Sequence, residues 1–220
     1  MTTLYDSTVK CPNCGTLNTV YSIGSTNAFG PGDLDTRPPH MARSNIMYGV
    51  ESCTNCGLSA GSLGSVDKSG LAYFKSEEFR EVHDSVPFVG LAENYWTAYL
   101  LALKAGALDE AVYHILRVAW ASDDTGNDEA ARMAREIMIE TLHKHKKKPS
   151  YLAPGKPATG YLMLADITRR AGRLDDAIEL ARHAMEKGKD FVRELAKLEI
   201  DLCERNETGC FMVNGEKRLH

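Results

Sequence analysis

The sequence predicts a mainly α-helical protein with a small β module at its N-terminal end. Two Cys-x-x-Cys-Gly motifs lie in the first 57 residues, among short segments with strand-like alternation and many glycines, serines and prolines. After about residue 90, apolar residues recur at helical spacing. A stretch of related sequence then occurs twice, as Lys-Ala-Gly-Ala-Leu-Asp-Glu-Ala and as Arg-Ala-Gly-Arg-Leu-Asp-Asp-Ala.

The two cysteine motifs predict a metal site. A two-residue spacer lets both thiolates of one tight turn bind the same ion, and the following glycine suits the positive φ of such a turn. Two turns supply four sulfurs, the full set for a tetrahedral structural zinc ion, so we predict one Zn²⁺ per chain. Iron suits the same four thiolates and stays an alternative. Two unrelated thiol pairs and a dithiol redox site are less favoured. The predicted ligands are Cys11, Cys14, Cys53 and Cys56.

Short strands are expected on either side of an irregular insertion. Residues 16–23 alternate weakly, and residues 46–51 place Ile46, Tyr48 and Val50 on one face. Residues 28–40, between them, are rich in glycine and proline and read as a long loop. Residues 71–83 are expected to be helix or extended chain.

Helices follow the module. Asp109 is expected to cap the second of them, and Asn127 or Asp128 the third. Asn214-Gly215 suggests a small hairpin in the tail. The expected helices span residues 92–105, 109–121, 128–146, 159–171, 175–187 and 189–205.

An internal repeat links the first helix pair with a later one. In each copy glycine ends one helix, aspartate begins the next, and alanine permits close packing, which are the offsets of a tetratricopeptide helix pair. Only one clear helix, 128–146, separates the copies. Either residues 147–158 contain a further helical turn, or the helices form a tetratricopeptide-like bundle. The matching positions are Tyr95, Gly106 and Ala111 against Tyr161, Gly172 and Ala177.

The expected organisation therefore has three parts. Residues 1–88 form a zinc-ribbon-like module with a long loop between the knuckles. Residues 89–206 form a tetratricopeptide-like helical domain, and residues 207–220 form a tail or small hairpin.

Over roughly residues 9–188 the chain resembles an uncharacterised prokaryotic family, a domain of unknown function with two N-terminal Cys-x-x-Cys knuckles and a tetratricopeptide-like C-terminal half. The resemblance implies metal binding and a helical repeat but no established reaction. The family's second knuckle usually has proline after its first cysteine and an aromatic residue after its glycine, where this chain has Thr54 and Leu58. The motifs are Cys11-Pro12-x-Cys14-Gly15, Asp33-x-Asp35, Tyr48 before Cys53-x-x-Cys56-Gly57, Ala119-Trp120, and Tyr161-Leu162 with Arg169-Arg170 and Gly172.

Two other clusters are candidate sites. In the loop, two aspartates at alternate positions could bind a cation or act as acid and base. The favoured interpretation is that they form turns and pair with arginine. A basic run near residue 145 could contact phosphate or nucleic acid, but a solvated helix end is favoured. The loop candidates are Asp33, Asp35, Arg37 and His40; the basic candidates are His143, Lys144, Lys146, Lys147 and Lys148.

Individual residues outside these clusters also carry expectations. Trp96 and Tyr113 are expected at the surface, and Cys203 in the core.

Composition narrows the function. The net charge of −4 provides no global basic field for nucleic acid, and no apolar run is long enough to cross a membrane. The N-terminus lacks a secretion-signal pattern, which favours a cytoplasmic protein. Four protein ligands would leave no open position for hydrolysis at the metal.

We therefore expect a non-enzymatic protein-interaction or scaffold protein whose helical groove holds a protein segment. A nucleic-acid-associated factor, using the ribbon and the 143–148 cluster, is the alternative. A thiol redox sensor or enzyme comes third, and the oligomeric state is left open.

Overall fold

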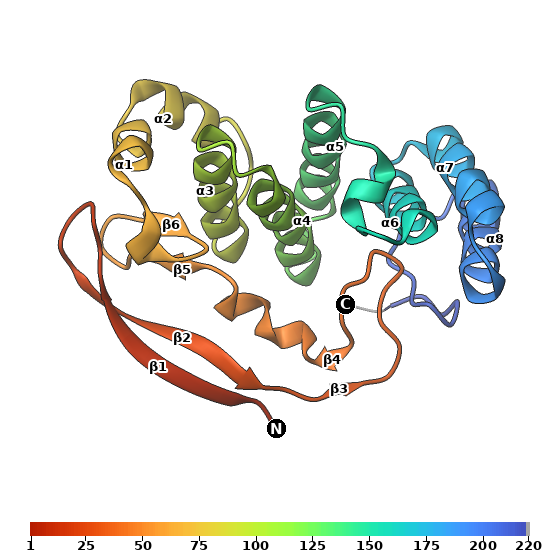
Figure 1. The fold of residues 1–220 in the computed structure, drawn as a ribbon, viewed down its shortest axis with the longest axis horizontal. Coiled ribbons are helices and arrows are strands. Elements are labelled where there is room, and N and C mark those ends of the chain that lie inside the picture. The colour runs from red at the N-terminus through yellow and green to blue at the C-terminus, as the bar shows by residue number, and fades with distance from the viewer. Residues whose placement is uncertain (219–220) are drawn as a thin grey trace. The chain divides into compact units, whose positions relative to one another are not determined.

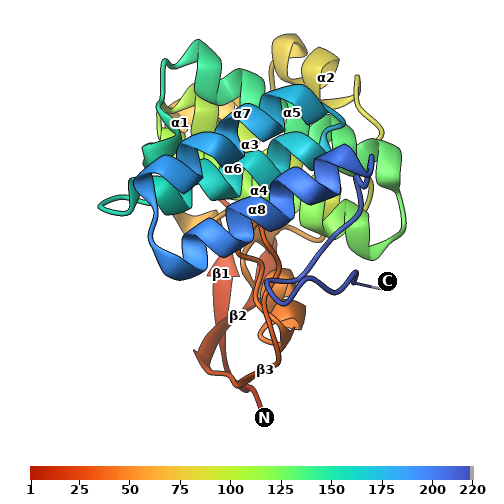
Figure 2. The ribbon, with the colours of Figure 1, turned by 90° about the vertical axis from the view of Figure 1, so that its right-hand side faces the viewer.

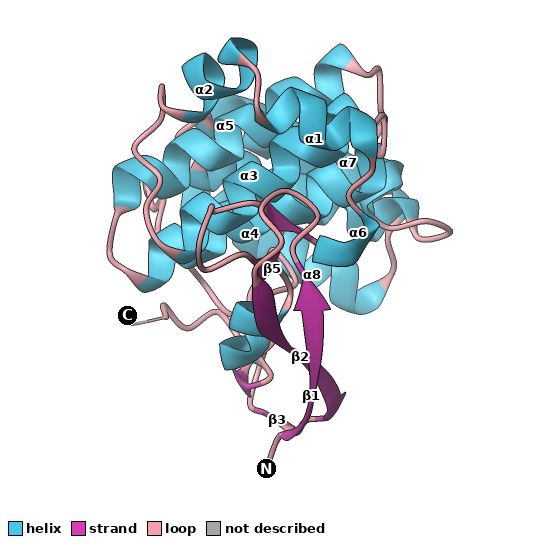
Figure 3. Cartoon of the chain, turned by 90° about the vertical axis from the view of Figure 1, so that its left-hand side faces the viewer, coloured by secondary structure: helices cyan, strands magenta, loops and turns pink. Residues whose placement is uncertain are grey.

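The computed structural model describes residues 1–218 and confirms a mainly α-helical fold with small two-stranded sheets in the N-terminal region (Figures 1 and 3). Residue contacts divide the chain into two compact units. Unit 1 contains Met1–Ala28 and Met41–Ala134, and unit 2 contains Phe29–His40 and the chain from Arg135 onward. These are groups of contacting residues, and the domain boundaries expected at 88 and 206 stay a prediction.

Unit 1 begins with a long antiparallel hairpin. Strand β1 (Thr3–Lys10) pairs with β2 (Leu17–Ser25), and Lys10 lies opposite Leu17 across the first cysteine knuckle. The sequence indicated β2 but not β1, because almost every side chain of β1 is exposed and its sequence shows no apolar alternation. A second antiparallel pair, β5 (Glu51–Ser52) and β6 (Ser59–Ala60), brackets the second knuckle.

The prediction of a strand over residues 46–51 is wrong for most of these residues. Arg43–Tyr48 form a 3₁₀ helix, η1, and only Glu51 belongs to a strand. The carbonyl of Ile46 accepts hydrogen bonds from the Gly49 amide at 3.2 Å and from the Tyr95 hydroxyl at 2.6 Å. A tertiary contact with a buried tyrosine therefore outweighs the local alternation of apolar residues.

Short helices follow the second knuckle. They are η2 (Leu63–Ser65), α1 (Lys68–Phe74) and α2 (Glu77–His83). Side-chain oxygens of Asp67 and Ser76 cap α1 and α2 by accepting the amides of Gly70 and Phe79.

Helices α3 (Leu91–Lys104) and α4 (Leu108–Asp124) form an antiparallel pair in unit 1 (Figure 1). Gly106 turns the chain between them with a φ of 74°. The cap expected at Asp109 is wrong, because α4 begins at Leu108 after Ala107, and Asp109 lies in the first turn. An acidic residue there still favours the helix dipole.

Helix α5 (Asp128–Lys144) begins in unit 1 and ends in unit 2. The cap expected at Asn127 is confirmed, since its side-chain oxygen accepts the amide of Ala130 at 3.1 Å.

Unit 2 is built mainly from α6 (Pro157–Arg170), α7 (Leu174–Lys187) and α8 (Asp190–Glu204), which lie side by side in Figure 2. The segment 147–158 contains one short 3₁₀ helix, η3 (Pro149–Leu152), packed on α6. Gly172 turns between α6 and α7 with a φ of 89°, the role that Gly106 has in the earlier pair.

The core of unit 2 includes residues from distant parts of the sequence. Leu34 comes from the segment 29–40, which the short strands β3 (Ala28–Phe29) and β4 (His40–Met41) bracket. Phe211 comes from a small hairpin after α8, in which the Met212 amide donates to the Glu216 carbonyl. The buried members are Leu34, Leu162, Ala165, Ala181, Ala184, Leu195, Ala196, Leu202 and Phe211.

Candidate metal centre

The two cysteine knuckles have the same backbone geometry. In the first, the Gly15 amide donates to the Cys11 carbonyl at 2.9 Å and the Cys11 amide donates to the Thr16 carbonyl at 2.8 Å. In the second, the corresponding bonds join Gly57 to Cys53 at 3.0 Å and Cys53 to Leu58 at 2.8 Å. Gly15 and Gly57 have φ angles of 79° and 74°, so glycine is needed at both turns.

The four cysteine sulfurs converge on one point. All of them lie within 4.8 Å of one another. The Cys11–Cys56 and Cys14–Cys53 sulfur pairs are 3.7 and 3.5 Å apart. Tetrahedral coordination with zinc–sulfur bonds of about 2.3 Å requires sulfurs roughly 3.8 Å apart. The spacing therefore fits one metal ion with four thiolate ligands.

The environment of the sulfurs favours thiolates unevenly. Contacts with Thr16 and Asn55 lower the pKa of Cys14 to about 5, whereas burial raises the pKa of Cys11 to about 12. Burial also raises the pKa of Cys53, but the amides of Asn55 and Cys56 outweigh it and the net direction is downward. A cation would supply the remaining stabilisation that a buried Cys11 thiolate needs.

Asn18 joins the two knuckles and was not singled out from the sequence. Its side-chain amide donates to the Thr16 carbonyl at 3.0 Å, next to the first knuckle. Its side-chain oxygen accepts the Thr54 amide at 3.0 Å and the Thr54 hydroxyl at 3.1 Å, inside the second knuckle. Only 3% of the Asn18 surface is exposed. A proline at position 54 has no amide hydrogen and could not donate this bond, which explains why a residue other than proline suits this position.

The loop candidates of the segment 29–40 are anchored by ion pairs. Asp35 accepts from Arg170 at 3.2 Å and from the Arg37 amide at 3.1 Å, and Asp33 accepts from Arg218 at 2.6 Å. Both aspartates and Arg37 are buried, whereas His40 is exposed. Burial raises the pKa of Asp35, and the Arg170 cation opposes this rise. The ion pairs with arginine agree with the interpretation that these aspartates have a structural role. A catalytic or cation-binding role stays a prediction.

A second buried ionic cluster centres on Arg169, the neighbour of Arg170 in the motif noted above. Its guanidinium donates to Glu199 at 2.8 Å, to Asp166, and to the carbonyls of Glu207 and Gly209. Burial raises the pKa of Glu199 to about 8, and the nearby Asp166 carboxylate adds to the effect. This cluster ties α6 and α8 to the chain after α8, so its role is structural.

The basic candidates lie at and beyond the end of α5, where they are exposed. The Lys146 and Lys147 amides donate to the carbonyls of His143 and Leu142, which closes the helix. The Lys147 ammonium lies 4.7 Å from the centre of the Tyr151 ring. The positions match a helix end, and contact with nucleic acid stays a prediction.

Other side chains expected from the sequence are divided between surface and core. Tyr113 is exposed as expected, with the Arg117 guanidinium stacked on its ring at 3.0 Å. The prediction that Trp96 lies at the surface is wrong. Its ring stacks on Tyr99 at 5.1 Å and meets Phe88 edge-on at 5.3 Å, so aromatic packing buries it. Cys203 is in the core, as expected.

Comparisons with protein-family models, with curated proteins and with solved structures found no match. The family resemblance therefore stays a prediction, whereas the cysteine cluster and the helical C-terminal half are present. Over residues 1–218, no helix has both the length and the apolar character needed to cross a membrane.

Proposed function

We propose that this protein is a zinc-binding interaction protein, in which one Zn²⁺ stabilises the N-terminal knuckles and the helices recognise a protein segment. The observation that carries the zinc part is the convergence of four sulfurs within 4.8 Å from two matching knuckles. Cys11, Cys14, Cys53 and Cys56 would hold the ion, which would supply charge and cross-linking rather than catalysis, because four protein ligands fill its coordination shell.

A structural role for the ion agrees with the surroundings of the centre. Strands β1 and β2 expose most of their side chains, and a two-stranded hairpin is marginally stable in water. The β1–β2 hairpin therefore needs stabilisation beyond its own packing, and an ion bound at the knuckle between its strands would provide it.

The metal is tested by elemental analysis of protein purified without added metal. We expect about one zinc per chain, and Cys53→Ser to remove it. Cys203→Ser is the matched control, because Cys203 is a buried thiol away from the knuckles. Iron in place of zinc would refute the assignment of the ion but not the site, whereas protein folded at both knuckles with no metal would refute the site.

The interaction part is supported by the helix pairs. Ala111 and Ala177 are both fully buried at matching places after the glycine turns, so each pair packs closely. Tyr113 and Arg117 present an exposed aromatic–guanidinium stack on α4, and residues of these types are enriched in protein interfaces.

Salt dependence distinguishes a protein partner from nucleic acid. Once a partner has been isolated, its affinity is measured between 50 and 200 mM salt. A steep loss of affinity with salt, abolished by replacing Lys144, Lys146 and Lys147 with glutamine, would favour nucleic acid. A weak salt dependence, with loss of binding on Tyr113→Ala, is the result expected for a protein segment.

Thiol chemistry gives the test of the redox alternative. In the metal-loaded protein we expect the four knuckle cysteines to resist alkylation and to become reactive after a chelator is added. Reversible oxidation with metal release at mild oxidant levels would favour a redox sensor instead.

A further inference from the structure

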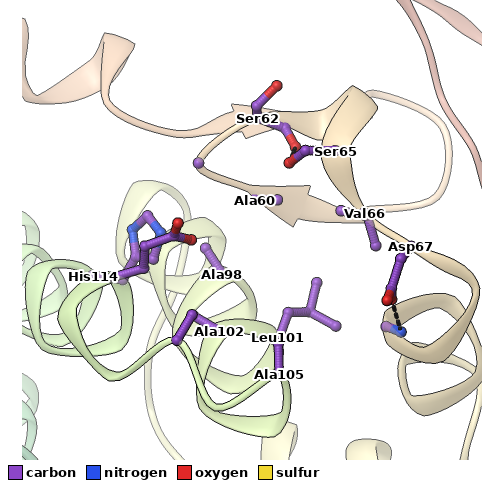
Figure 4. Close-up of a pocket in the computed structure, with 14 residues that line it drawn as sticks. Ala60, Ser62, Ser65, Val66, Asp67, Ala98, Leu101, Ala102, Ala105 and His114 are labelled. Carbon is purple, nitrogen blue, oxygen red and sulfur yellow. Dashed lines mark hydrogen bonds between the residues drawn. The ribbon is translucent and has the colours of Figure 1, made fainter.

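A cavity in unit 1 lies between the chain after the second knuckle and the α3–α4 pair (Figure 4). Its volume is about 280 Å³, which is near the lower end of the range for small-ligand pockets. Residues from Ala60 to Gly70 form one wall, and residues of α3 and α4 form the other. The cavity shares no residue with the metal centre.

The floor of the cavity is aliphatic. Ala98, Leu101 and Ala102 of α3 are buried side chains that line it, and Ala60 and Val66 face them from the opposite wall (Figure 4). Among the described residues, 1–218, the imidazole of His114 is the one aromatic ring in the lining. A flexible aliphatic chain suits such a surface better than a flat ring system does.

The charged residues that line the cavity within residues 1–218 are both acidic, Asp67 and Glu110. Arg117 lies outside the lining, although its charge reaches His114. One oxygen of Asp67 accepts the Gly70 amide at 2.7 Å, which leaves its other oxygen for further bonds. Glu110 has no ion-pair partner within the described chain, residues 1–218.

His114 adds a polar group to the α3–α4 wall, beside Glu110. It follows Glu110 by one helical turn, so the two side chains are neighbours on α4. His114 is 2% exposed, and its Nδ1 atom has no hydrogen-bond partner among residues 1–218, while the Nε2 edge faces Gly61 in the cavity lining. Burial lowers the pKa of His114 to about 4, so the ring is neutral at pH 7. The tautomer with its proton on Nδ1 offers a lone pair at Nε2.

We propose that this cavity binds a primary alkylammonium group, carried by a small amine or by a lysine side chain. The aliphatic stem packs on Ala98, Leu101 and Ala102. The ammonium donates to the Glu110 carboxylate and to the His114 imidazole, within the negative field of Asp67. An ammonium has three donors and no acceptor, which complements a carboxylate beside a neutral imidazole. The proposal does not depend on which metal the knuckles bind.

The probes are n-pentylamine and N-acetyl-lysine methylamide, with 1-pentanol and N-acetyl-norleucine methylamide as neutral counterparts. Binding to the full-length protein is followed by NMR shifts of the residues that line the cavity, at low salt. We expect both ammonium compounds to shift these signals and both neutral compounds to bind more weakly. Binding of n-pentylamine alone supports a free amine as the ligand, and binding of both supports a lysine side chain as well.

Two variants and one control locate the site. Glu110→Gln should weaken amine binding about fivefold, the effect of one partly exposed charge. Gly61→Val should abolish binding by filling the cavity. A Cβ at Gly61 meets only His114 at 3.5 Å, an ordinary contact, so this variant should fold. Glu129→Gln, in the first turn of α5, is the matched control and should bind like the unmodified protein.

Several results would overturn the proposal. The first is that n-pentylamine and N-acetyl-lysine methylamide both fail to shift the signals. The others are that the neutral counterparts bind as well as the ammonium compounds, and that Glu110→Gln and Glu129→Gln have equal effects.

Discussion

Replacing Asn18 with alanine should weaken the metal centre although no ligand is lost. The substitution removes the bond to the Thr16 carbonyl and two bonds from Thr54. At about 1 kcal/mol for each hydrogen bond, the upper limit is about 3 kcal/mol. Thr54 is exposed, so water can replace part of the loss there, and about 1.5–2 kcal/mol remains. This corresponds to a zinc affinity about 10- to 30-fold lower.

The affinity is measured by competition with a chromogenic zinc chelator at fixed pH. Asn27→Ala is the matched control, because Asn27 is an exposed asparagine in the same unit, beyond the end of β2. Thr54→Val, which removes only the hydroxyl bond, should have an intermediate effect. If Asn18→Ala and Asn27→Ala bind zinc equally well, Asn18 does not hold the knuckles together and the reasoning fails.

Three further predictions concern stability. Cys53→Ser should unfold the knuckle region and release the metal, seen as loss of zinc together with loss of NMR dispersion from β1 and β2; a retained hairpin would contradict this. The pKa of Glu199 is raised from 4.5 to about 8, so the folded state holds a proton that the unfolded state has lost. The free energy of unfolding should therefore fall as pH rises from about 4.5 to 8, and Glu199→Gln should flatten this dependence in denaturant titrations. Arg170→Ala should lower the free energy of unfolding by about 3–5 kcal/mol, because it removes one partner of a buried ion pair, the guanidinium 3.2 Å from the Asp35 carboxylate. The exposed Arg205–Asp201 pair provides the control, and Arg205→Ala should cost less than about 1 kcal/mol.

Features that depend on short-range chemistry could be predicted from the sequence. The cysteine knuckles depend on a four-residue spacing and a glycine, and the structure brings all four sulfurs together. The helices depend on periodicity and on terminal signals such as Asn127 and Gly106, and their ends lie within a few residues of the expected positions. The hairpin of the tail depends on Asn214-Gly215.

Features that depend on long-range contacts could not be predicted. β1 exposes most of its side chains, without an alternation of apolar residues, and is a strand only because it pairs with β2. Ile46 and Tyr48 alternate like strand residues, but the bond from Tyr95 favours a 3₁₀ helix. Asn18 looks like any polar strand residue until Thr54 is placed beside it.

The partners of the buried charges could not be identified from the sequence. Arg169 and Glu199 are 30 residues apart, and Asp35 and Arg170 are 135 residues apart. A charged side chain in a sequence is normally read as exposed, and only its partner shows that it belongs to the interior.

The segment Phe29–His40 has a consequence for the order in which the protein is made. During synthesis it leaves the ribosome well before Arg170 and Arg218, with which its aspartates pair. Leu34 likewise cannot pack in the core until α6 and α8 have been synthesised. These contacts of unit 2 therefore cannot all form until translation has passed Arg218. Until then, a metal bound by both knuckles would hold the chain between them, which contains this segment, as a closed loop. Loop closure reduces the number of non-native contacts that the segment can make.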